Sequence, residues 1–142
     1  MKRLLVAVIF TLLAQSLFAA GSVVVTSTTL GSGISQYTVA WTSDASGAVS
    51  GNLLTVRRGR VVQVKFRPGS GGTQPTDLYD ATLVDPDSVD LALGNGANLS
   101  NATSKLSTQT PGPYFNGEGR LDLVIANAGN AKTGTVIFLV GP

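Results

Sequence analysis

The sequence contains no cysteine and no histidine, and only 13% of its residues are charged. Without these two residue types the chain cannot build a disulfide, a thiol nucleophile, a zinc site of the Cys/His type or an imidazole acid–base pair. Glutamate occurs once, as Glu118 between two glycines, and no second carboxylate is marked as its partner for glycoside chemistry. We therefore predict that the protein is not an enzyme and has no cofactor and no bound metal.

Apolar residues and turn-forming residues are abundant instead. Of 142 residues, 43% are hydrophobic, 17 are glycine and 6 are proline. This composition is typical of a packed domain with short strands and many turns. A chain of this length can bury one hydrophobic core without disulfides.

The N-terminal segment 1–21 has the layout of a secretory signal peptide. Lys2 and Arg3 are followed by an apolar run from Leu4 to Leu13 and then by small residues suitable for cleavage. Gln15 interrupts the run well before the roughly 20 residues that a membrane-spanning helix needs. We predict a signal peptide or an apolar leader that is retained, and no stable membrane span.

The remaining residues, 22–142, form the predicted domain. They hold eight basic and eight acidic residues, because the leader contains Lys2 and Arg3. Binding to nucleic acid or to an anionic membrane relies on excess positive charge. We therefore expect no nucleic-acid partner.

Three segments alternate strictly between apolar and polar residues, which is typical of half-buried strands. The alternation places Trp41 in the core rather than on a carbohydrate-binding surface. The predicted core positions are Tyr37, Val39 and Trp41, then Val62, Val64 and Phe66, then Leu121, Leu123 and Ile125.

Further strands are predicted where β-branched residues gather between turns. They cover residues 23–30, 49–56, 78–85, 89–93 and 133–140, and they bring the total to about eight. Gly-, Asn- and Pro-containing turns separate them at short intervals. Strands joined by short turns pair antiparallel, so the expected fold is all-β, a single antiparallel β-sandwich or small jelly roll.

A long irregular stretch runs from Gly94 to Gly119, and residues 98–106 within it could form one or two helical turns. Tyr114 and Phe115 lie in this stretch. Long connections in small domains often contact ligands or neighbouring molecules. The two aromatic residues are candidates for contacts between copies, or they cap the open end of the sandwich.

Charges of opposite sign occupy two separate segments. If the segments belong to different edges, a basic edge of one copy can meet an acidic edge of the next and fix the partner. If strand 61–67 lies beside strand 78–85, the charges pair within one sheet instead. The candidate contact residues are Arg57, Arg58, Arg60, Lys65 and Arg67 in the first segment, and Asp77, Asp80, Asp85, Asp87 and Asp90 in the second.

The second charged segment also contains closely spaced oxygen ligands, Asp85 to Asp90, which are of the type that calcium requires. Val89 and the missing glycine and terminal glutamate depart from the helix–loop–helix calcium pattern. A hairpin turn at Asp85-Pro86-Asp87-Ser88 is the favoured interpretation.

Several segments resemble a family of small tailed-bacteriophage proteins, which are taken to be virion structural proteins. The resemblance covers most of residues 35–140 and consists of turns and strand patterns. Its main segments are residues 41–50, 75–85, 89–90, 94–98 and 123–136. It implies a β-sandwich that decorates a capsid or belongs to a tail or neck, and that functions through contacts with copies of itself and with other virion proteins.

The leader departs from what the resemblance implies, because phage subunits assemble in the host cytoplasm. An exported subunit of a surface filament or matrix is the alternative. Ser22 to Leu30 is rich in Val and Thr and has no charge, so it could be added as a strand to the sheet of a neighbour. The predicted location is the virion or, in the alternative, the cell surface or the medium.

Overall fold

The computed structural model describes residues 21–115 and 119–142. Over these residues the chain forms nine strands and one short 3-10 helix. The elements are β1 (Ser22–Thr29), β2 (Ser35–Thr42), β3 (Leu53–Thr55), β4 (Gly59–Pro68), η1 (Gly71–Thr73), β5 (Asp80–Val84), β6 (Lys105–Thr108), β7 (Tyr114–Phe115), β8 (Arg120–Ala126) and β9 (Thr133–Gly141). The predicted leader lies outside the described residues apart from Gly21, and the described part has no helix that could cross a membrane.

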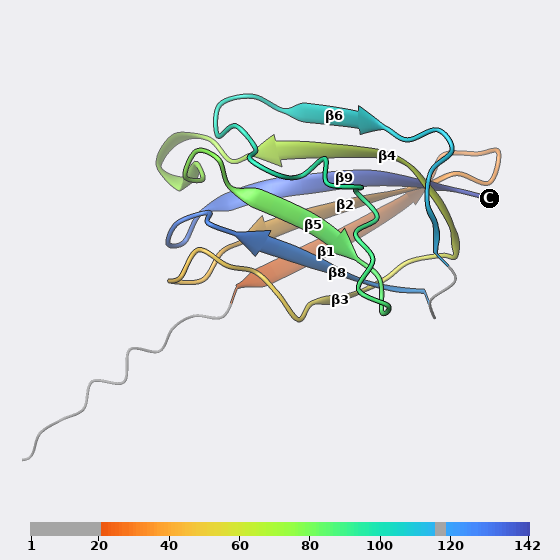
Figure 1. Cartoon of the computed structure of the whole chain (residues 1–142), viewed down its shortest axis with the longest axis horizontal. Coiled ribbons are helices and arrows are strands. Elements are labelled where there is room, and N and C mark those ends of the chain that lie inside the picture. The colour runs from red at the N-terminus through yellow and green to blue at the C-terminus, as the bar shows by residue number, and fades with distance from the viewer. Residues whose placement is uncertain (1–20, 116–118) are drawn as a thin grey trace, which may run out of the picture.

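The strands form two antiparallel sheets that pack face to face (Figure 1). One sheet has six strands in the order β1-β2-β9-β4-β6, with β7 also paired to β4. The other has three strands in the order β3-β8-β5. The predicted all-β sandwich is therefore confirmed, and one of its layers is wider than the other.

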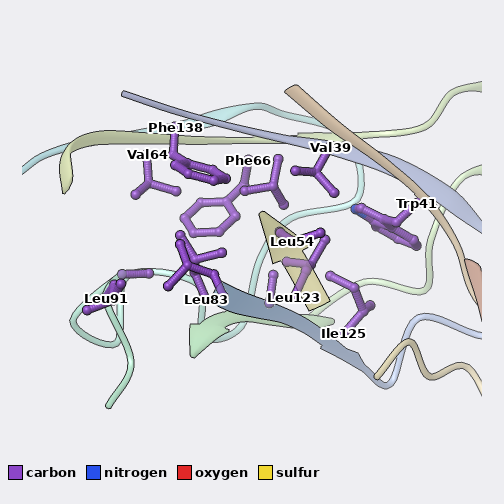
Figure 2. Close-up of a cluster of buried hydrophobic side chains, with 14 of the residues drawn as sticks. Val39, Trp41, Leu54, Val64, Phe66, Leu83, Leu91, Leu123, Ile125 and Phe138 are labelled. Carbon is purple, nitrogen blue, oxygen red and sulfur yellow. The ribbon is translucent and has the colours of Figure 1, made fainter. Parts of the chain in front are cut away.

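The core fills the space between the two sheets (Figure 2). Val39, Trp41, Phe66 and Phe138 approach from the six-stranded sheet, and the three-stranded sheet contributes the side chains opposite them. Trp41 contacts Tyr79 with ring centroids 5.8 Å apart. The three-stranded layer and its loops supply Leu54, Leu83, Leu91, Leu123 and Ile125.

One predicted core position is wrong because of a β-bulge. The pairing of β4 with β9 shifts register between Val61 and Gln63, so one extra residue interrupts the alternation there. Val61 is fully buried, whereas the predicted Val62 is only half-buried, and burial resumes as expected at Val64 and Phe66. The regular alternation of apolar and polar residues in the sequence gives no sign of such an extra residue.

Three other predicted elements also differ. The strand predicted over 49–56 is reduced to β3 and an isolated bridge between Val49 and Ile125. Residues 89–93 form turns instead of a strand, with a single bridge at Asp90. The stretch 94–119 includes β6 and β7, and residues 98–106 form no helical turn.

Candidate assembly interface

The basic residues lie in β4 or just before it, and the side chains of two of them bind other parts of the chain. Arg57 donates a hydrogen bond to the carbonyl of Gly33 at the tip of the β1–β2 hairpin. Arg60 donates to the carbonyl of Gly112 at 3.1 Å, and its guanidinium lies 5.6 Å from the centre of the Tyr114 ring. Arg58 and Arg67 are exposed and Lys65 is half-buried.

The acidic residues serve mainly to fix loops. Their carboxylates accept hydrogen bonds from backbone N–H groups, which is how Asp stabilises turns. Asp90 accepts three such bonds, and Asp85 accepts two, from Asp87 and Val89. Asp77 and Asp80 each accept one, and Asp80 also accepts a bond from the side chain of Asn127. Asp87 is exposed at the tip of the turn.

This placement overturns the pairing of the two charged segments within one sheet. β4 belongs to the six-stranded sheet and β5 to the three-stranded sheet, so they are not neighbouring strands. The expectation assumed that strands close in sequence pair with each other, whereas β4 pairs with β9, β6 and β7. Charge complementarity between copies is still a prediction, but four of its five acidic residues already have backbone partners within the chain.

The predicted aromatic contacts lie on β7 beside β4. Tyr114 is 54% exposed and is held against Arg60. Phe115 pairs with Gly59 through the backbone. Of the predicted contact residues, the structure therefore brings Arg60, Tyr114 and the backbone of Phe115 together at one end of the wider sheet.

The strongest candidate for an interface is β1, which the sequence predicts as a strand without marking it as a sheet margin. It pairs with β2 over all eight residues, and every one of them except Val23 is exposed. Val24 is 67% exposed and Val25 38%. Within the described residues, no backbone hydrogen bond reaches the free side of β1.

The other margins of the two sheets are short or covered. β3 and β6 have three and four residues. The free side of β5 is bonded to the loop that follows it, through Leu91 to Leu83 at 2.7 Å and Ala81 to Gly96 at 2.8 Å. Within the part of the chain that the structure describes, β1 is therefore the one long uncovered edge.

The direction of the free backbone groups of β1 follows from its register. Leu30 N–H donates to the carbonyl of Ile34, which continues the β1–β2 ladder. Because antiparallel strands alternate between bonded and non-bonded pairs, the even-numbered residues of β1 bond to β2. The N–H and C=O groups that face away from the sheet are then those of Val23, Val25, Ser27 and Thr29.

A second surface feature is a hollow of about 600 Å³ on the outer face of the three-stranded sheet. Leu53, Asp122 and Val124 line it, together with the turn 85–88. The Asp122 carboxylate accepts hydrogen bonds from the backbone of Gly51 and Asn52. The Ser88 N–H donates to the Asp85 carbonyl at 3.0 Å and the Asp85 N–H to that of Val89 at 3.1 Å, so residues 85–88 form the predicted hairpin turn. Among the described residues, no group of three His, Cys, Asp or Glu side chains is placed to hold a metal ion.

Among the described residues, two side chains have clearly shifted pKa values, and both shifts have structural causes. The Ser46 hydroxyl and the Ala48 N–H donate to the Asp44 carboxylate and lower its pKa. Burial raises the pKa of Tyr79 to about 12. Asp44 fixes a turn and Tyr79 fills the core.

Comparison of the chain with protein-family models, with curated proteins and with solved structures finds no match. The fold itself defines the class, a small antiparallel β-sandwich with layers of unequal width.

Proposed function

We propose that the chain is a non-enzymatic structural subunit that functions by binding other copies of itself and other proteins of an assembly. The observation that supports this most strongly is the free edge of β1, which nothing in the described part of the chain covers. Its outward N–H and C=O groups can pair with another strand without any rearrangement of the sandwich.

The composition of β1 adds to this support. Natural monomeric proteins protect long edge strands with charged residues, proline, bulges or a covering segment. β1 has no charged residue, no proline and no bulge, and its eight residues are Val, Ser and Thr only. An unprotected edge favours pairing with another chain, which fits a protein that functions by associating.

Within this role, we place the chain first in a phage virion, as a capsid decoration or a tail or neck subunit. The resemblance in the turns around residues 41–50, 75–85 and 123–136 is the reason for this choice. An exported filament or matrix subunit is the second candidate, and the signal-like segment 1–21 favours it. Mass spectrometry of purified particles, together with N-terminal sequencing of the native protein, separates the two locations.

The assembly role is tested by sedimentation velocity of the full chain over a range of concentrations. Val25→Lys places a charge on the core-side face of β1. Natural proteins use such inward-pointing charges to keep an edge strand from pairing, so the variant should abolish self-association. Leu53→Lys is the matched control, because Leu53 is an exposed apolar residue on the margin strand of the other sheet.

We expect the unmodified chain and Leu53→Lys to form oligomers as concentration rises, and Val25→Lys to sediment as a monomer. A full chain that stays monomeric at every concentration and is missing from any particle or fibre would refute the proposal.

A further inference from the structure

We propose that two copies join through β1, antiparallel, about a two-fold axis that passes beside Thr26. This inference rests on the proposed assembly role and adds the partner, the register and the symmetry. The partner is a second copy of this chain, and the product is one continuous sheet across both subunits.

The register follows from which backbone groups of β1 are free. Two free edges can exchange hydrogen bonds only where an outward-facing residue meets an outward-facing residue of the other copy. One symmetric register pairs all four outward-facing residues of β1. It places Val23 opposite the partner's Thr29 and Val25 opposite the partner's Ser27, and each pair occurs twice. This arrangement forms about eight hydrogen bonds, two for each pair. Shifting the register by two residues leaves Thr29 opposite residue 21, beyond the end of the strand.

The chemistry of β1 suits a copy of itself. The segment from Gly21 to Ile34 has no charged residue, so symmetric pairing brings no like charges together. Residues directly opposite in a sheet share a face, and Val23 and Val25 lie opposite Trp41 and Val39 of the core. The added strand would therefore extend the core face of the wider sheet.

Because the six-stranded sheet is wider than the three-stranded sheet, apolar side chains at the β1 margin remain partly exposed. Val39 is fully buried, whereas Val25 directly opposite it remains 38% exposed. Pairing with a second copy places another strand beside Val25 and removes part of this exposed surface from water. Because a two-fold contact is closed, it consumes the edge of both copies and yields a dimer. Larger assemblies would then grow from dimers through other surfaces, such as the outer face around Arg60 and Tyr114.

The test uses single engineered cysteines, which report cleanly because the chain has none of its own. In the proposed register Thr26 lies opposite the partner's Thr26 as a non-hydrogen-bonded pair, with Cα atoms about 4.5 Å apart. That separation allows a disulfide. Thr28→Cys is the matched control, since two such residues would lie four positions apart along the strands, about 13 Å.

Under mild oxidation at micromolar concentration, we expect Thr26→Cys to become almost wholly a covalent dimer and Thr28→Cys to stay uncrosslinked. Val24 lies opposite the partner's Thr28, so Val24→Cys mixed with Thr28→Cys should give a crosslinked heterodimer that neither forms alone. This mixed pair keeps the test available if Thr26→Cys does not fold.

Failure of the dimer can be told apart from failure of the assembly role. If the unmodified chain self-associates but neither Thr26→Cys nor the mixed pair crosslinks, the two-fold register is wrong and the assembly role stands. Crosslinking of Thr28→Cys alone also overturns this register. If the unmodified chain does not self-associate, the dimer is wrong, and if it is also missing from any particle or fibre, the assembly role is wrong as well.

Discussion

Replacing Asp90 with alanine should destabilise the fold by about 2–4 kcal/mol. Its Oδ1 accepts hydrogen bonds from the N–H groups of Leu83 at 3.2 Å and Ala92 at 2.9 Å, and its Oδ2 accepts one from Gly94 at 2.8 Å. Hydrogen bonds to a charged group contribute about 1.5–3 kcal/mol each, and partial exposure to water reduces the sum. The loop that Asp90 fixes also holds Leu91 in the core, where it is 1% exposed.

The assay is urea unfolding followed by the fluorescence of Trp41, the one tryptophan. Asp87→Ala is the control, because Asp87 is also an aspartate, lies three residues from Asp90 and is exposed at the tip of the turn. Removing its carboxylate should change the free energy of unfolding by less than about 0.5 kcal/mol. Asp90→Asn keeps one acceptor oxygen and should fall between the two. If Asp90→Ala and Asp87→Ala have equal stability, the acidic segment does not fix the loop and is free for contacts with other molecules.

Two further predictions concern stability. Gly134→Ala places a methyl group against the ring of Trp41 and the carbonyl of Arg67, so it should destabilise the fold by about 1–3 kcal/mol and alter Trp41 fluorescence. Gly72→Ala is the control, because its methyl group would meet nothing within 4 Å and should leave stability unchanged. Equal stability of the two variants would contradict the close packing at Gly134. Because the pKa of Asp44 is lowered in the folded state, its carboxylate stabilises the fold at pH values above its ordinary pKa of about 4, and this stabilisation is lost as the pH falls. Asp44→Asn should therefore lose less stability on acidification than the unmodified chain. Parallel acid unfolding curves of the two proteins would contradict this.

The sequence predicted the fold class because the strands around Trp41, Phe66 and Leu123 combine strict alternation with clear turns. It could not predict which strands share a sheet. The pairing of β2 with β9 joins residues about a hundred positions apart, and no local pattern reports such a contact. The assumption that 61–67 and 78–85 pair was wrong for this reason.

The candidate site was harder to predict than the fold. A cluster of acidic residues looks the same in a sequence whether its carboxylates face solvent or bind the backbone, and only the loop geometry shows that Asp77, Asp80, Asp85 and Asp90 bind the backbone. The strand over 23–30 was predicted, and its lack of charge was visible. Its position at a sheet margin depends on the order of all the strands, which the sequence does not reveal.

Residue-resolved hydrogen exchange of β1 at low and high protein concentration tests the account most directly. The N–H groups of Val24, Thr26 and Thr28 bond to β2 and should be protected at both concentrations. Those of Val23, Val25, Ser27 and Thr29 should exchange rapidly in dilute solution and become protected as concentration rises. If these four exchange equally fast at every concentration, the free edge of β1 is not where copies of this chain meet.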